Sequence, residues 1–366
     1  MSELTQLIQR FRSKRIVVFG DLVADVFVYG EISRISREAP VLILNHRETQ
    51  TVPGGGANAI HNLRALGANP IPVGIVGDDA EGRQLLEYFS KLGIDVRGIR
   101  VTKSYRTPTK MRILAGAVHS HRQQIVRLDS GGALKQDKIQ SGLDRRLHLA
   151  LAHANALLVS DYGYGLVTPE FLSKVKWNGL PATIDSRFGL ESFSGMTAAT
   201  PNEPEVEAAL GITIGNDVKK LEWAGRSLLR KLKHDALLIT RGKDGMALFE
   251  RGKKTVHIPI HGTDEIADVT GAGDTVIATF TLALAAGGSY YDAARLANYA
   301  GGIVVMKHGT RPVTYEELAE VCSGELENHP GASARWLSRH PSLAGGEPDK
   351  IRGGFQVPKS KRRRQS

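Results

Sequence analysis

The sequence predicts an α/β fold in which a mostly parallel central sheet is covered on both faces by helices. Short apolar runs bounded by Gly, Asp or Pro alternate with stretches of helical periodicity along most of the 366 residues. Uninterrupted apolar runs are typical of parallel strands buried on both faces, and intervening helices provide the connections that parallel strands need. A hydrophobic content of 41% in a chain of this length is sufficient for a large core.

The elements are expected in the following order. Apolar runs predict strands at 16–19, 71–75, 156–159, 182–184, 236–239 and 246–249. Helical periodicity predicts helices at 57–66, 81–92, 143–152, 203–210, 218–232, 275–286, 291–306 and 315–321.

Two stretches break this alternation. Residues 26–51 and 99–128 alternate polar and apolar side chains without intervening helices, which predicts a small antiparallel sheet apart from the main one. We expect this sheet to be a lid that excludes water at the carboxyl ends of the parallel strands. A dimerisation flap is the other interpretation, and one sheet can serve both purposes.

The charge is distributed unevenly along the chain. The net charge is +10, and half of this excess comes from residues 325–366, which hold nine Lys or Arg against four acids. The Gly, Pro and Ser content of this stretch predicts a disordered basic tail after a single domain at 1–324. The final KSKRRRQS is either a solvated tail or a weak binder of RNA, and the rest of the chain shows no nucleic-acid face.

Cysteine content and hydropathy indicate the compartment. Cys322 is the one cysteine, so no internal disulfide can form, which fits a reducing cytoplasm. No apolar stretch reaches the ~18 residues of a membrane span, and the polar N-terminus lacks the apolar segment of a signal peptide. We therefore expect a cytoplasmic protein without a membrane partner.

The most informative motif is DVTGAGDT at 268–275. Gly271, Ala272 and Gly273 allow a tight turn with uncovered amide hydrogens, and the apolar run that follows predicts a helix. A helix N-terminus with free N–H groups suits an anion such as a phosphoryl group in transfer. Asp274 can accept the proton of an attacking hydroxyl there. The alternative interpretation is that Asp274 only caps the helix.

Other polar motifs follow the predicted strands, where a sheet of this kind places its ligands. GDLVAD at 20–25 offers Asp21 and Asp25, whose carboxylates can hold sugar hydroxyls. PGGGAN at 53–58 is a glycine turn that opens a helix, and it offers Gly54, Gly55 and Asn58 to a polyhydroxy ligand. The chain contains neither GxxxxGK[ST] nor GxGxxG, so neither a P-loop nor a dinucleotide fingerprint is predicted.

Later motifs point to a metal ion and a nucleotide. Asn202 and Glu205 lie three apart at a predicted helix start, where they can hold the water shell of Mg²⁺ or simply cap the helix. Asp161 and Asp185 each follow an apolar strand. The polar turn TRGKDG at 240–245 can meet nucleotide phosphates, and a simple hairpin turn is the alternative.

Together these motifs resemble the ribokinase-like (PfkB) family of carbohydrate kinases from about residue 15 to 321. The family's C-terminal signature is similar to 268–274, its N-terminal glycine signature to 54–58 and its Asn-x-x-Glu element to 202–205, in the family's order. Within the family, the resemblance extends to the heptose-7-phosphate kinase domain of lipopolysaccharide-heptose synthesis. It is carried by GDLVADVFVYGEISRISREAPV at 20–41, TPTKMRIL at 107–114 and QQIVRLD at 123–129.

The resemblance implies an ATP- and Mg²⁺-dependent kinase that phosphorylates the anomeric hydroxyl of a heptose 7-phosphate. A kinase for another sugar or sugar phosphate, and a non-catalytic sugar or nucleotide sensor, are the alternatives. The resemblance implies Asp274 as the base, Gly271, Ala272 and Gly273 as the anion hole, and a sugar site that includes Asp21, Asp25, Gly54, Gly55, Asn58 and Asp161. It places Asn202, Thr240, Arg241, Gly242 and Asn298 at the nucleotide, and Asn202, Glu205 and Asp185 at the metal. A monovalent cation near the anion hole and a homodimer through the lid are further expectations.

Basic side chains would distinguish a phosphosugar from a neutral sugar. A distal phosphate needs two or three charge-assisted donors, and we expect at least half of the candidates to be solvated instead. The candidates are Arg34, Arg37, Arg106, Lys110, Arg112 and Arg127.

The sequence departs from the related heptose kinases at two places. Tyr164 stands where Asp-Tyr-Ala-Lys-Gly has its lysine, and Ser186-Arg187 stand where Asp-Pro-Lys is usual. No HxGH motif of the nucleotidyltransferase domain found in bifunctional relatives occurs, so we expect kinase activity alone.

Overall fold

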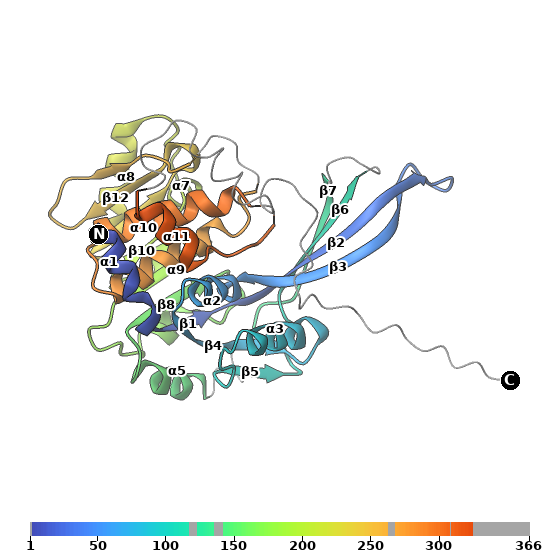
Figure 1. The fold of residues 1–366 in the computed structure, drawn as a ribbon, viewed down its shortest axis with the longest axis horizontal. Coiled ribbons are helices and arrows are strands. Elements are labelled where there is room, and N and C mark those ends of the chain that lie inside the picture. The colour runs from blue at the N-terminus through green and yellow to red at the C-terminus, as the bar shows by residue number, and fades with distance from the viewer. Residues whose placement is uncertain (1, 117–122, 135–141, 263–267, 308, 325–366) are drawn as a thin grey trace.

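The computed structural model describes residues 2–116, 123–134, 142–262, 268–307 and 309–324 (Figure 1). The predicted tail at 325–366 lies outside the described residues. A large sheet and its covering helices form the body, and a smaller sheet extends from one end of it (Figure 1).

The large sheet contains every strand that the apolar runs predicted. Its described strands are β1 (Arg15–Gly20), β4 (Asn69–Gly77), β5 (Ile99–Thr102), β8 (Ala156–Asp161), β9 (Ala182–Ser186), β10 (Ala198–Ala199), β11 (Ala236–Thr240), β12 (Met246–Glu250) and β13 (Val256–Ile258). They lie in the order β13-β12-β11-β10-β9-β8-β1-β4-β5. The strands from β11 to β5 are parallel, and β12 and β13 add antiparallel pairs at one edge.

Several helices begin at a capping side chain that precedes a periodic apolar run, while α2, α5 and α9 begin at a glycine. Asp79, for example, accepts a hydrogen bond from the N–H of Gly82 at the start of α3, and Thr314 and Glu317 form a capping box at α11. The described α-helices are α1 (Glu3–Gln9), α2 (Gly56–Ala65), α3 (Ala80–Lys91), α5 (Leu143–Leu151), α6 (Pro169–Leu172), α7 (Glu203–Leu210), α8 (Val218–Leu232), α9 (Ala272–Ala285), α10 (Tyr290–Val305) and α11 (Tyr315–Cys322). Short 3₁₀ turns lie at Phe11–Ser13, Leu190–Ser192 and Gly242–Asp244. None of the described helices has the length and apolar content needed to cross a membrane.

Two apolar layers cover the two faces of the large sheet. Ile16 and Val18 of β1 pack into one layer, which includes side chains of α1, α2, α3, α9, α10 and α11. Val17 and Phe19, which alternate with them, pack into the other layer against α5, α6, α7 and α8. The strands are therefore buried on both faces, as their apolar runs predicted.

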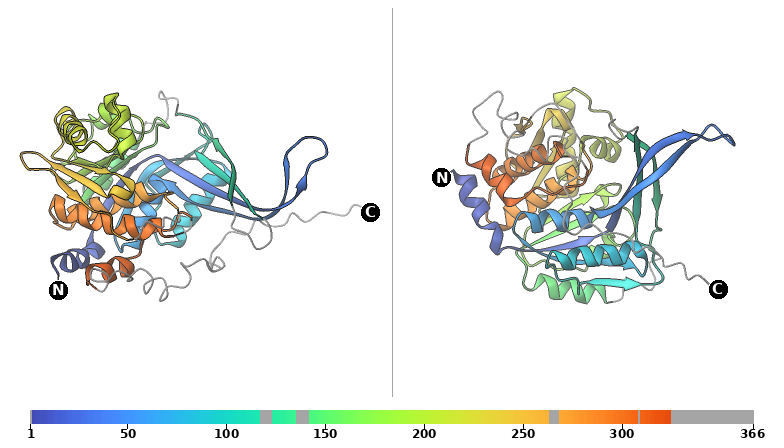
Figure 2. Two further views of the ribbon diagram at one scale, coloured as in Figure 1. Left: turned by 90° about the horizontal axis from the view of Figure 1, so that it is seen from above. Right: turned by 45° about the vertical axis from the view of Figure 1, so that its right-hand side comes forward.

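The small sheet has the described strands β2 (Leu22–Ile35), β3 (Leu42–Gly55), β6 (Thr109–Gly116) and β7 (Gln123–Ser130), in the order β3-β2-β6-β7. The β2–β3 and β6–β7 pairs are antiparallel, and β2 and β6 pair in parallel. The β2–β3 ribbon extends far from the body (Figure 2). Its inner end reaches the large sheet, because β2 follows β1 and β3 leads directly into α2.

Two details differ from the sequence-based expectation. Residues 99–102 were assigned to the small sheet, but they form β5, which is parallel to β4 in the large one. Helix α3 lies between these strands, and a strand-helix-strand connection normally returns the second strand parallel to the first. The helix expected from residue 275 begins at Ala272, so the glycine turn is itself the helix start.

Candidate active site

The glycine turn at the start of α9 brings two distant segments together. Gly271 occupies the N-cap position with φ +80°, in the left-handed region that favours glycine. A Cβ at this position would lie 2.6 Å from Nδ2 of Asn58 in α2. Glycine is therefore needed both for the backbone conformation and for the approach of Asn58.

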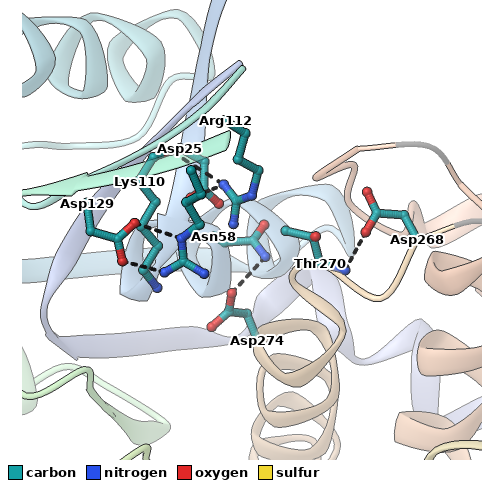
Figure 3. Close-up of polar contacts among 9 residues, drawn as sticks. Asp25, Asn58, Lys110, Arg112, Asp129, Asp268, Thr270 and Asp274 are labelled. Carbon is teal, nitrogen blue, oxygen red and sulfur yellow. Dashed lines mark hydrogen bonds and ion pairs between the residues drawn. The ribbon is translucent and has the colours of Figure 1, made fainter. Parts of the chain in front are cut away.

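Asp274 lies in the first turn of α9 and is 3% exposed. Its Oδ2 accepts a hydrogen bond from Nδ2 of Asn58 at 2.9 Å (Figure 3), and its Oδ1 accepts one from the hydroxyl of Tyr162 at 2.7 Å. The interpretation of Asp274 as a helix cap is wrong, because Gly271 holds the N-cap position and makes no side-chain capping bond.

The protonation state of Asp274 suits proton transfer near neutral pH. Burial raises the pKa of Asp274 to about 6, although the hydrogen bonds from Asn58 and Tyr162 and the charge of Lys110 lower it. A carboxylate with this pKa is mostly ionised at pH 7 and binds a proton more readily than an exposed aspartate. The site can therefore hold a base close to its working pH.

The amide hydrogens next to Asp274 can receive an anion. The N–H of Ala272 donates to the carbonyl of Val269 at 3.2 Å, but the N–H groups of Gly273 and Asp274 have no acceptor within the described ranges. A Cβ on Gly273 would meet no atom of the described residues within 4 Å, so among these residues open space lies beside the donors. Free donors at the start of a helix, facing open space, fit a phosphoryl group.

Charged side chains of the small sheet approach the same turn. Arg112 of β6 donates to Asp25 of β2 at 2.8 Å, in a largely buried ion pair. A Cβ on Gly54 would lie 2.7 Å from the Asp25 carboxylate, so the glycine makes room for it. Lys110 is 9% exposed, and its Nζ lies 4.4 Å from the centre of the Tyr162 ring. Figure 3 shows Asp25, Lys110 and Arg112 gathered above Asn58 and Asp274.

Two acids expected at the sugar accept hydrogen bonds from the protein itself. Asp21 is 1% exposed, and its Oδ2 accepts hydrogen bonds from the backbone N–H groups of Tyr162 and Tyr164. Asp161 accepts from the N–H of Gly163 and from the hydroxyl of Ser186. Both carboxylates thus hold the loop after β8, which carries Tyr162. Burial raises the pKa of Asp21 to about 7 and also raises the pKa of Asp161.

The structure separates the basic candidates into two groups. Lys110 and Arg112 lie at the site and are largely buried. Arg127 is close enough for its charge to act on Lys110, but it is exposed and pairs with Asp129 on the same strand (Figure 3). Arg34 is exposed on the outer part of β2, opposite Ile43, and Arg106 is exposed in the loop after β5. The expectation that at least half of this set is solvated agrees with these positions.

The predicted nucleotide and metal residues lie after the carboxyl ends of β9 to β11, except Asn298, which lies on α10. Asn202 and Glu205 form a capping box, as the alternative interpretation held, and Asn202 forms a β-bridge with Thr240. Arg241 pairs with Glu203, and Asn298 donates to the carbonyl of Pro259. Gly242 follows with φ +53°.

Asp185 and Glu205 add negative charge at this edge. Burial raises the pKa of both carboxylates, and the charge of Glu205 raises that of Asp185 further. Two mutually repelling acids suit a divalent cation. No group of three His, Cys, Asp or Glu side chains in the described part of the chain is arranged to hold a metal ion directly. Mg²⁺, which keeps several waters, needs no such group.

A family comparison agrees with this arrangement. Residues 13–317 match the model of the pfkB family carbohydrate kinases. The chain belongs to this family. It is 39% identical to the bifunctional protein HldE of Coxiella burnetii over 329 residues, which are 88% of this chain and 67% of that protein. It is 42% identical to HldE of Geobacter sulfurreducens over 311 residues, which are 82% of this chain and 61% of that protein.

Solved structures show the same fold. Arabidopsis thaliana ribokinase, complexed with ribose and ATP, matches with a TM-score of 0.68 at 24% identity, covering 84% of this chain and 98% of that one. Phosphofructokinase-2 of Escherichia coli, in complex with substrates and products, matches with a TM-score of 0.69 at 17% identity, covering 86% and 100%. The kinase therefore has the ribokinase-like fold that the motifs predicted.

Tyr162, which donates to Asp274, was not among the residues predicted for the site. Its position directly after Asp161, in the segment that resembles Asp-Tyr-Ala-Lys-Gly of related kinases, could have indicated it. The ring of Tyr162 also lies 3.1 Å from where a Cβ of Gly55 would be, so this loop is in contact with the chain at the start of α2.

Proposed function

We propose that this kinase transfers the γ-phosphoryl group of ATP to the anomeric hydroxyl of a heptose 7-phosphate, in the cytoplasm and with Mg²⁺. The observation that carries the proposal is Asp274, a buried carboxylate with a raised pKa beside two free amide hydrogens and open space. Membership of the carbohydrate kinase family and the similarity to HldE proteins support the sugar class.

Each part of the reaction has residues that suit it. Asp274 would accept the proton of the anomeric hydroxyl as the new O–P bond forms, and the N–H groups of Gly273 and Asp274 would hold the transferring group. Little covalent chemistry is required of the protein in phosphoryl transfer, so catalysis is positioning and electrostatic stabilisation.

The acids at the nucleotide edge fit the metal. Asp185 and Glu205 would hold the water shell of Mg²⁺, because their mutual repulsion is relieved by a cation between them. The bound metal supplies charge neutralisation for the phosphates of the nucleotide. Asn202, Thr240, Arg241, Gly242 and Asn298 remain proposed nucleotide contacts. A monovalent cation near the glycine turn and a homodimer through the small sheet also belong to the proposal.

The sugar and its distal phosphate would lie between the small sheet and α2. Asp25 and Asn58 would bind hydroxyls, and Lys110 and Arg112 would bind the phosphate. Within the described residues Lys110 has no carboxylate in ion-pair contact, so its buried charge is available to an anion. A neutral sugar would leave this charge without a partner.

Turnover against a panel of heptose, hexose and pentose phosphates tests the proposal. We expect ADP release with heptose 7-phosphate and a 1,7-bisphosphate product. Phosphorylation of ribose or a hexose phosphate, but not of heptose 7-phosphate, would assign the chain to another sugar. Asp274→Asn should lower kcat by orders of magnitude while the Kd for ATP stays near the wild-type value, and an equal loss of ATP binding would indicate a structural role.

A further inference from the structure

A second asparagine lies behind the pair formed by Asn58 and Asp274. Asn62 is one helical turn after Asn58 on the same face of α2 and is 0% exposed. Its Nδ2 donates to Oδ1 of Asn58 at 3.1 Å and to the backbone carbonyl of Asn58 at 3.0 Å. Its Oδ1 accepts from the hydroxyl of Thr275 at 3.1 Å and from the backbone N–H of Val313 at 3.3 Å.

The order of donors and acceptors in this chain of contacts is set at its inner end. A backbone N–H can only donate, so Val313 requires the oxygen of the Asn62 side chain, which turns the NH₂ group of Asn62 towards Asn58. Oδ1 of Asn58 accepts there, and its Nδ2 is left to face Oδ2 of Asp274 and the carbonyl of Gly271. Both of these groups accept, so every contact in the chain joins a donor to an acceptor.

We propose that Asn62 is a positioning residue for the proposed catalytic base: it holds the oxygen end of the Asn58 side chain and so keeps the NH₂ end in place against Asp274. Asn62 acts through Asn58 and touches neither Asp274 nor the open space beside Gly273. The inference rests on the proposed function, in which Asp274 takes the proton of the substrate.

The consequence for Asp274 follows from electrostatics. Without Asn62, Oδ1 of Asn58 loses its donor, and the amide is held only through its Nδ2, by Oδ2 of Asp274 and the carbonyl of Gly271. The hydrogen bond from Asn58 to the carboxylate is then less well positioned and favours the charged form less, so the pKa of Asp274 rises above its present value of about 6. The other ionisable groups that face Asp274 are not altered by a substitution in α2: Tyr162, Lys110, Asp25 and Asp185.

The test compares Asn62→Leu and Asn62→Ser with the wild type. Leucine has the same branched shape, with a larger volume and no donor. Serine in a helix bonds the carbonyl one turn earlier, which here is that of Asn58, and so leaves Oδ1 of Asn58 without a partner. The primary measurement is the carboxyl ¹³C titration of Asp274 in protein with labelled aspartate, assigned with Asp274→Asn. We expect the midpoint to rise by up to about one pH unit, less than for the complete loss of a hydrogen bond to a charged group.

A double substitution tests whether Asn62 acts through Asn58. Asn58→Ala should raise the midpoint on its own, and adding Asn62→Ser to Asn58→Ala should raise it no further. The acid limb of the pH profile of kcat/KM, which reports the free enzyme, should move with the NMR midpoint in each variant. The NMR titration needs no substrate. It therefore tests the role of Asn62 even if heptose 7-phosphate proves not to be the substrate.

Thr281→Val is the matched control for a structural effect. Thr281 is buried on α9, and its hydroxyl bonds Thr183 and the carbonyl of Ile277, so this change removes buried hydrogen bonds away from Asn58. It should lower the melting temperature and leave the midpoint of Asp274 unchanged. The proposal is overturned if the Asn62 variants lose stability as Thr281→Val does while Asp274 titrates as in the wild type, or if the shift persists in the Asn58→Ala background.

Discussion

The hydroxyl of Tyr162 donates a hydrogen bond to Oδ1 of Asp274 across 2.7 Å, between residues 112 positions apart in the sequence. The loop that carries Tyr162 is also held by Asp21, whose carboxylate accepts a hydrogen bond from the backbone N–H of Tyr162. Asn58 binds the other oxygen of Asp274. The proposed base is therefore oriented from two sides, by a helix and by a loop, before any substrate is bound.

Tyr162→Phe removes one of these two donors. The pKa of Asp274 should rise by roughly one unit, because a hydrogen bond to the charged form is lost. The acid limb of the pH profile of kcat should therefore move to higher pH, with the plateau above pH 8 reduced only a few-fold. Tyr164→Phe is the control, since it removes a nearby hydroxyl that does not contact Asp274. A profile of Tyr162→Phe that overlays the wild type would show that this hydrogen bond does not tune the base.

Two alanine substitutions separate folding from function at the glycine turn. Gly271→Ala should destabilise the protein by about 1–2 kcal/mol or more, because its φ of +80° is unfavourable for alanine and the new Cβ meets Asn58. Gly273→Ala should keep or slightly raise the melting temperature, since its Cβ meets no atom and alanine favours helix. The methyl group would nevertheless fill the proposed phosphoryl site, so kcat/KM should fall strongly. Full activity of Gly273→Ala would show that the phosphoryl group does not occupy this space.

Lys110→Met tests the proposed site of the distal phosphate. The KM for the sugar phosphate should rise about tenfold or more, and the KM for ATP should change little, because a charge-assisted contact to the sugar alone is lost. Lys103→Met, an exposed change in the loop after β5, is the control. An equal rise in KM for the sugar without its phosphate would indicate that Lys110 serves another part of the substrate.

The buried Asp21 predicts a pH dependence of stability. Its pKa is raised from an ordinary 3.8 to about 7 by burial. A group with a raised pKa stabilises the fold fully below pH 3.8, and this stabilisation is lost as the pH rises through 7; the raised pKa of Asp274 acts in the same direction. The free energy of unfolding in urea should therefore fall between pH 5 and pH 8.

Asp21→Asn should reduce this fall, by at most a few kcal/mol. Asn keeps an acceptor for the two loop N–H groups, so the comparison isolates the charge. The exposed Asp78→Asn should leave the pH dependence as in the wild type. A pH dependence that is the same in Asp21→Asn and the wild type would show that Asp21 does not titrate in this range.

Much of the kinase was predictable from local patterns. Strands β1, β8 and β11 and helix α8 could be predicted from runs of neighbouring residues. A strand buried on both faces is apolar throughout, and a helix buried along one face is apolar at every third or fourth residue. The glycines before α9 could be recognised because a tight turn requires glycine wherever it occurs. β5 was misassigned because four residues carry too little pattern, although the preceding helix indicated a parallel strand.

The sequence by itself therefore determined the fold class and the family resemblance, and it led to Asp274 as the proposed base. Only the tertiary structure decided what contacts that residue. A tyrosine from the loop after β8 donates to it, and Asn58 donates to it while accepting from Asn62, whose own oxygen accepts from the backbone N–H of Val313. The tertiary structure also showed that Asp21 binds the backbone of the loop that carries Tyr162. These contacts join residues that are far apart in the chain. Their geometry depends on how the helices pack on the sheet, which no local pattern records.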